Sequence, residues 1–294
     1  MDMQPAGTLH SDLGGRRIDP SDDIRAWVRE AWIEPSRHIA AKLGTPGYSL
    51  PPLSGFTWHP LVTGSPARNV TVNASAQAAD NWLLLPPEEH RPATVTVTLY
   101  GHASRNIVVV GPDSHIAASV FLHGVGGVAV IGAGVSMPTT LSLRLWDLAN
   151  TVLWGAASTA NEVSIIAAGD GRSILVGDDC MFARDITIRC SDHHAMVDMR
   201  SGRQINDPAS VLIEPHVWIG QDTMILKGVR IGYGAMIGAK SLVNQSVPRF
   251  SMAAGVPSRV IRSDVSWSRK AMAEPDLLPR LRAMADQLDP PFVE

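Results

Sequence analysis

The chain is poor in cysteine and in charge. Only Cys180 and Cys190 are present among 294 residues, too few for a disulfide framework, and their spacing fits no metal site. Charged residues make up 18%, and the net charge of −3 gives no reason to expect nucleic acid or an anionic membrane as the main partner. We therefore expect a protein that holds no metal and binds no nucleic acid.

Long apolar runs are also missing. No segment approaches the ~18 uninterrupted apolar residues of a membrane-spanning helix. The first residues lack the apolar core of a secretory signal. The expectation is a cytoplasmic protein without a transmembrane segment. Apolar residues still amount to 45%, which is enough for a globular core.

Residues 1–92 are expected to form an N-terminal extension. Ser21 is a suitable N-cap, and apolar residues from Ile24 to Trp32 recur at helical spacing, which predicts a helix over about 21–34. Residues 45–92 contain much of the proline and little periodicity. They predict an irregular covering segment.

A repeat begins near Thr94. Short β-branched runs end in glycine at intervals of about one coil of a solenoid, and no helical pattern lies between them, which argues against a βαβ fold. The repeat then becomes regular, with an aliphatic residue at every sixth position. These residues are Ile213, Ile219, Ile225, Ile231, Ile237 and Val243. The fourth residue after each is small or β-branched: Val217, Thr223, Val229, Ala235, Ser241 and Val247.

A period of six fits neither an amphipathic helix nor a heptad. It fits a chain that turns every six residues and sends one aliphatic side chain inward from each side of a triangular coil. Chance alternation in a β-sandwich is the competing interpretation. We predict an all-β fold with a parallel β-helix over residues 93–262. A tail over 263–294 follows, in which Leu277, Leu281, Met284 and Leu288 have helical spacing.

The ladder breaks between Ile188 and Ile213, which predicts a loop over residues 189–212. A loop on a rigid solenoid is a common place for function. The loop contains the pair His193-His194, and histidine is well suited to general-base chemistry near neutral pH. Solvated histidines, turn aspartates and a metal site are the alternatives. The metal alternative lacks a third ligand at a fitting spacing.

Several motifs in order resemble the hexapeptide-repeat acyltransferases of the left-handed β-helix class. The segment is similar in particular to bacterial polysaccharide-type O-acetyltransferases related to xenobiotic acetyltransferases. It runs from Val176 to about Arg269, about a third of the chain. The matching text is VGDDCMFARDITIRCSDHHAMVD, GRQIN, HVWIGQDTMILKGVRIGYGAMIGAKSLV, AAGVPSRVIR and VSWSR. The left-handedness is implied by this resemblance alone.

The family pattern D-x-H-x-I-x-D is present from Asp192 to Asp198, with methionine in place of isoleucine. The resemblance implies that His194 and Asp192 are the catalytic residues, with His194 as the general base. It also implies that the active site is lined by Asp198, Asn206 and Trp218. Trp218 is alternatively a packing residue.

The resemblance further implies acetyl-CoA as the acyl donor, bound between subunits of a homotrimer. The residues implied for cofactor binding are Gly220, Gly238, Ala239, Lys240 and Arg259. Lys240 replaces the usual glycine of the family turn, and Arg259 is alternatively a solvated surface charge.

Three functions remain open. The first is transfer of an acetyl group from a CoA thioester to a hydroxyl of a sugar or saccharide. The second is acetylation of a small hydroxylated metabolite or antibiotic. The third is a catalytically silent β-helix that acts as a scaffold.

Overall fold

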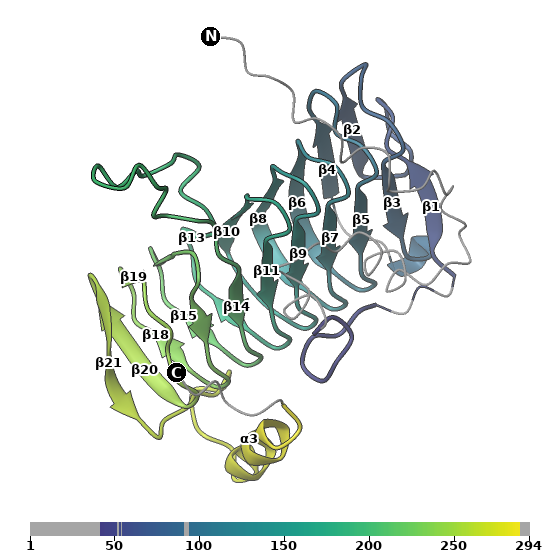
Figure 1. Cartoon of the computed structure of the whole chain (residues 1–294). Coiled ribbons are helices and arrows are strands. Elements are labelled where there is room, and N and C mark those ends of the chain that lie inside the picture. The colour runs from purple at the N-terminus through teal and green to yellow at the C-terminus, as the bar shows by residue number, and fades with distance from the viewer. Residues whose placement is uncertain (1–41, 52, 54, 91–93, 289–294) are drawn as a thin grey trace.

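Stacked strands of an elongated parallel β-helix make up most of the computed structural model (Figure 1). The structure describes residues 42–51, 53, 55–90 and 94–288. The helix expected over about 21–34 lies outside these residues.

Three sheets run along the β-helix. The first sheet contains, in spatial order, β1 (Thr57–Pro60), β3 (Trp82–Leu85), β5 (Ile107–Val110), β7 (Val128–Ile131), β9 (Thr151–Trp154), β11 (Ser173–Val176), β14 (Val211–Ile213) and β17 (Arg230–Ile231). The second sheet contains β19 (Leu242–Val243), β16 (Met224–Ile225), β13 (Ile186–Arg189), β10 (Glu162–Ala167), β8 (Ser136–Leu145), β6 (His115–Leu122), β4 (Thr94–Leu99) and β2 (Val70–Ala74). The third sheet contains β12 (Met181–Phe182), β15 (Trp218–Ile219), β18 (Met236–Ile237), β20 (Ser251–Gly255) and β21 (Ser258–Ser263). The described helices are a 3-10 turn, η1 (Glu88–His90), and α3 (Leu277–Ala285).

The coils have two different lengths. In the C-terminal part, Leu212 faces Arg230, so that one coil consists of three hexapeptides. In the N-terminal part, Leu83 faces Val108 and Val108 faces Ala129, so that each coil takes more of the chain. We call residues 70–189 the wide coils and residues 211–247 the hexapeptide coils. The hexapeptide coils carry short strands such as β17, whereas β8 in the wide coils is much longer.

The parallel β-helix begins earlier than the expected boundary at residue 93. Strand β2 already pairs in parallel with β4, and β3 pairs in parallel with β5. The strands of these first coils do not follow a six-residue period, because the wide coils contain long strands joined by turns of variable length. No regular spacing in the sequence therefore marks the first coils.

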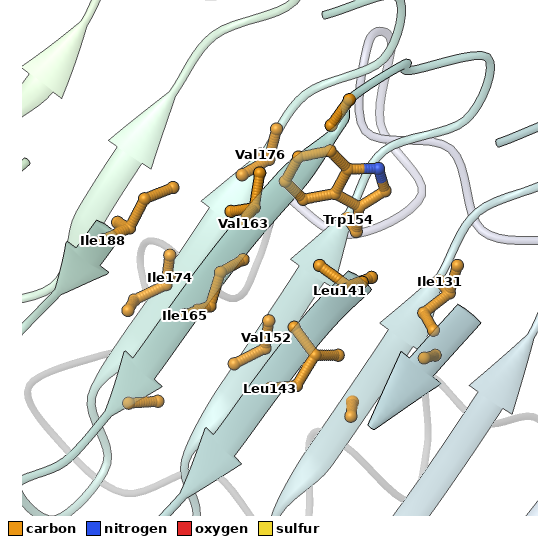
Figure 2. Close-up of a cluster of buried hydrophobic side chains, with 14 of the residues drawn as sticks. Ile131, Leu141, Leu143, Val152, Trp154, Val163, Ile165, Ile174, Val176 and Ile188 are labelled. Carbon is orange, nitrogen blue, oxygen red and sulfur yellow. The ribbon is translucent and has the colours of Figure 1, made fainter. Parts of the chain in front are cut away.

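The predicted aliphatic ladder forms the core of the hexapeptide coils. Each of its six members is at most 2% exposed, and the residues four positions later are buried as well. The parallel pairing of successive coils rules out a β-sandwich. In the wide coils the same role falls to alternating Leu, Ile and Val side chains around Trp154 (Figure 2).

Buried asparagines line one turn of the wide coils. The Asn81 Oδ1 atom accepts hydrogen bonds from the Asn106 backbone N–H (3.0 Å) and Nδ2 (2.8 Å). The Asn106 Oδ1 atom accepts from the Gly127 N–H at 2.7 Å. These amides satisfy backbone groups that the turn leaves without a strand partner.

A buried carboxylate joins the first hexapeptide coils. Glu214 is 2% exposed and accepts hydrogen bonds from Arg230, from Arg249 Nε (2.6 Å) and from the Tyr233 N–H (2.8 Å). Burial alone would raise the pKa of Glu214, but the hydrogen bonds from Arg249 and Arg230 outweigh it. The pKa is therefore lowered from its ordinary value of 4.5.

Antiparallel pairs end the parallel stack at both ends. Strand β1 is antiparallel to β3, and β20 is antiparallel to β21. The tail then returns along the β-helix, where the Trp267 ring stacks on His216 at 4.3 Å and Arg269 Nε donates to Asp179 at 2.8 Å. Helix α3 follows, which confirms the helical spacing from Leu277. Among the helices that the structure describes, none is both long and apolar enough to cross a membrane.

Candidate active site

One loop stands out from the β-helix between β13 and β14 (Figure 1). Ile174 faces Val211, so this coil is far longer than the next one, in which Leu212 faces Arg230. The loop leaves after Cys190, which is buried, and its base is closed by a hydrogen bond from the Ala209 N–H to the Cys190 carbonyl at 2.9 Å. The rigid coil thus continues beneath the insertion.

Asn206 holds the histidine segment of this loop. Its Nδ2 donates to Asp192 Oδ2 at 2.9 Å and to the His194 carbonyl at 2.8 Å. Its Oδ1 accepts from the Met196 N–H at 2.7 Å. One amide therefore fixes the backbone on both sides of His194, and the resemblance had already singled this residue out.

Lys227 is a site residue that the sequence reasoning missed. Its Nζ donates to Asp192 Oδ2 at 2.5 Å and to the Asn206 carbonyl at 2.7 Å. The hydrogen bond from Lys227, followed by the one from Asn206, lowers the pKa of Asp192. The pairing of successive coils could have revealed Lys227. Ile188 faces Ile225, so residue 227 lies on the next coil beside Cys190, where the loop begins.

His194 itself is exposed on the loop. The preceding His193 has a positive φ of 64°, and its N–H donates to Ser191 Oγ at 3.0 Å, which forms a tight bend before His194. Among the described residues, no hydrogen bond joins Asp192 to the His194 ring. The Asp192 carboxylate is engaged by Lys227 and Asn206, so it positions the segment instead of contacting the imidazole.

Asp198 organises the tip of the loop. Its Oδ1 accepts from the Ser201 N–H (2.7 Å), the Ser201 hydroxyl (2.8 Å) and the Arg200 N–H (3.1 Å). The same bonds, led by that of the Ser201 backbone, lower the pKa of Asp198. This geometry is that of a turn residue.

Three of the residues expected to bind the cofactor, Gly220, Gly238 and Ala239, lie at one corner of the β-helix, between the third and second sheets. A Cβ on Gly220 would lie 2.5 Å from the Ala239 nitrogen, and a Cβ on Gly238 would lie 2.9 Å from the Ala254 Cβ. A residue with a side chain therefore cannot replace glycine at positions 220 and 238 without displacing the neighbouring coil. We call Gly220, Gly238, Ala239 and Ala254 the glycine corner.

Two cations lie next to the glycine corner. Lys240 follows Ala239 directly, with a φ of 58° and its Nζ 3.4 Å from Asp222. Arg259 faces Ala254 across the β20–β21 pair, and its guanidinium donates to the Ser258 carbonyl at 2.7 Å. Both side chains are exposed at the end of the molecule that β20 and β21 form.

Trp218 lies on the outer side of β15, 41% exposed and 6.1 Å from the Trp267 ring. Trp218 is the first residue of β15, and Gly220 follows that strand directly. The loop, by contrast, joins the second sheet to the first. The structure therefore brings His194, Asp192 and Asn206 together at one corner, and Trp218 and the glycine corner together elsewhere on the same chain.

Both cysteines are packing residues. Burial raises the pKa of Cys190 to about 11 and raises that of Cys180 further. Such thiols are poor nucleophiles at neutral pH. Within the described ranges, no three His, Cys, Asp or Glu side chains are grouped as a metal site requires.

No family model matches the chain. It is 39% identical over 105 residues to a polysialic acid O-acetyltransferase of Escherichia coli O1:K1 / APEC, a match that covers 36% of this chain and 34% of that protein. It is 40% identical over 94 residues to a galactoside O-acetyltransferase of Lactococcus lactis subsp. lactis (strain IL1403), covering 32% of this chain and 44% of that protein. The chain thus spans less than half the length of these relatives.

A solved structure covers more of the chain. The polySia specific acetyltransferase NeuO superposes with a TM-score of 0.62 at 23% identity, over 76% of this chain and 100% of that chain. This likeness confirms the predicted fold, a left-handed parallel β-helix. The sequence relatives confirm the resemblance to O-acetyltransferases that act on saccharides.

Proposed function

We propose that the protein is an O-acetyltransferase that moves an acetyl group from acetyl-CoA to a hydroxyl of a saccharide. The observation that carries this proposal is the His194 segment, held by Asn206, Asp192 and Lys227 at the break in a hexapeptide β-helix. The polysialic acid and galactoside O-acetyltransferases to which the chain is similar support the saccharide acceptor. Because acetyl-CoA is an intracellular donor, we assign the reaction to the cytoplasm.

The reaction needs a base, and His194 is our candidate. The imidazole takes the proton of the acceptor hydroxyl as its oxygen attacks the thioester carbonyl. The tetrahedral oxyanion collapses, the carbon–sulfur bond breaks, and the CoA thiolate takes up a proton. The buried cysteines offer no alternative nucleophile, which supports direct transfer without an acyl-enzyme.

The glycine corner fits a path for the donor. Gly220 and Gly238 let neighbouring coils stack closely. The resulting narrow corner, with the small side chains of its two alanines, would offer a smooth outer surface to a narrow chain such as pantetheine. Lys240 and Arg259 provide positive charge for CoA phosphates beside this path. Trp218, half-exposed on the strand that leads to the corner, would face the acyl end.

The separation of the loop from the glycine corner supports an oligomer with its sites between subunits, and the family resemblance favours a homotrimer. Within one chain, the loop follows a strand of the second sheet, whereas the glycine corner precedes the strands of that sheet. The two therefore lie on opposite sides of the second sheet. A complete site therefore needs the loop of one subunit beside the glycine corner of its neighbour. We expect the molar mass in solution, measured by sedimentation equilibrium, to be three times that of the chain.

An acceptor panel tests the proposed function. The protein is incubated with acetyl-CoA and with sialic acid oligomers, β-galactosides and hydroxylated antibiotics, and products are read by mass spectrometry. Acetyl esters on saccharides support the proposal, and acetylation of the antibiotics alone contradicts it. A chain that transfers no acetyl group and shows no rise in melting temperature with CoA acts as a scaffold instead.

A further inference from the structure

Three aromatic side chains stack along the outside of the wide coils. Tyr100, His123 and Trp146 are each the first residue after a strand of the second sheet, namely β4, β6 and β8. The Tyr100 and His123 ring centroids are 4.2 Å apart at an interplanar angle of 5°. Those of His123 and Trp146 are 3.8 Å apart at 11°. We call these three residues the aromatic ladder.

The aromatic ladder ends at the candidate active-site loop. The His193 ring lies edge-on to Trp146, with centroids 5.6 Å apart at 75°. The equivalent position of the next coil is Ala168, since Leu145 faces Ala167. The β10–β13 register continues this row to Ser191, at the start of the loop. The ladder and His194 thus occupy the same corner of the β-helix.

Packing of the core does not explain these rings. Tyr100 is 44% exposed and Trp146 is 39% exposed in a chain with only 5% aromatic residues. The neighbouring outward row of the second sheet adds Phe121, with the Arg144 guanidinium 4.9 Å from its ring. The result is a strip beside the loop in which Tyr100 and Trp146 are exposed and His123, Phe121 and Arg144 are half-buried.

We propose that the aromatic ladder is an extended acceptor site, which binds a saccharide chain of several residues and presents it to His194. This inference rests on the proposed function and specifies its substrate as an oligomer. Sugar rings combine apolar C–H surface with hydroxyls, and Tyr and Trp offer an apolar body with a polar O–H or N–H. Two coil steps of about 4.8 Å give the ladder a length of roughly 10 Å, enough for more than one sugar ring.

Acceptor length is the variable that tests this proposal. Sialic acid oligomers and β-galactoside oligomers, from the monomer through the dimer and tetramer to the octamer, are compared as probes, by Kd from intrinsic fluorescence and by KM in the transfer assay. Wild type should bind one of the two octamer probes at least about tenfold more tightly than its monomer. Trp146→Ala should remove most of that difference, a loss of up to about tenfold as expected for one aromatic contact. Trp146→Phe should restore part of it.

Two further variants test whether the dependence on acceptor length comes from the aromatic ladder. Tyr100→Ala, at the far end of the ladder, should weaken binding of the octamer more than that of the dimer. Met272→Ala, an 82% exposed apolar side chain in the C-terminal tail, should keep the wild-type dependence on length. Circular dichroism checks that each variant is folded.

The failure of this proposal is distinguishable from failure of the proposed function. Binding is measured without acetyl-CoA, and also in the His194→Ala protein, so it does not depend on transfer. Equal Kd values for all lengths of both probes in wild type, or an octamer affinity unchanged by Trp146→Ala, would overturn the ladder site. Loss of length dependence with retained transfer to monomers would leave the proposed function intact.

Discussion

The wide coils and the hexapeptide coils build one continuous β-helix by different means. The hexapeptide coils rely on one buried aliphatic residue per side at constant spacing, with glycines where successive turns approach closely. The wide coils take more of the chain per turn, carry longer strands and fill one turn with asparagine. Regular spacing is found where the proposed donor path lies, and the longer strands present the outer face on which the aromatic ladder stands.

The largest effect should come from the charge cluster of the hexapeptide coils. Glu214→Ala leaves Arg230 and Arg249 beside a buried site without their carboxylate, which should lower the free energy of unfolding by about 3–5 kcal/mol. Urea denaturation measures this loss. The matched control is Glu162→Ala on the exposed side of β10, which should cost less than about 0.5 kcal/mol. Equal losses in the two variants would contradict the role given to Glu214.

The wide coils should be weakened next by loss of an asparagine. Asn106→Ala removes the acceptor of the Gly127 N–H and the donor to Asn81, and it should cost about 1–3 kcal/mol. Asn73→Ala, on an exposed position of β2, is the control. If the unfolding midpoint of Asn106→Ala equals that of the control, the asparagines do not stabilise the wide coils.

Trimming one methyl group compares the two cores directly. Ile231→Val in the hexapeptide coils and Ile165→Val in the wide coils should each cost about 1 kcal/mol, because both side chains are fully buried. Ile166→Val, whose side chain points outward and is half-buried, should cost much less. A negligible cost at Ile165 alone would show that the wide coils are loosely packed.

The smallest effect is expected from mild acid. Because its folded-state pKa is lowered, Glu214 contributes its full stability above pH 4.5, and that contribution is lost as pH falls through the folded-state value. At pH 4.5 the loss from this one carboxyl should be at most about 0.4 kcal/mol. Wild type should therefore lose more stability between neutral pH and pH 4.5 than Glu214→Gln does. Parallel pH curves would argue against a lowered pKa.

The sequence predicted the hexapeptide coils well because each inward position there is a single aliphatic residue at constant spacing. It placed the start of the β-helix too late, since strands such as β2 follow no fixed period. Within the loop, local pattern and resemblance led to His194 and Asn206. Lys227 was missed because its partners are a coil away and only register brings it to Asp192. The aromatic ladder was missed for the same reason: its rings are a whole coil apart in sequence and become neighbours only in the folded chain.

The rate of acetyl transfer by His194→Ala tests the central claim most directly. Thiol release from acetyl-CoA is followed with the saccharide that wild type acetylates, beside Met199→Ala, a 93% exposed residue at the tip of the same loop. Removal of a general base should lower kcat by about 10² to 10⁴, whereas Met199→Ala should match wild type. A His194→Ala protein that transfers acetyl groups at the wild-type rate would contradict the assignment of the loop as the catalytic element.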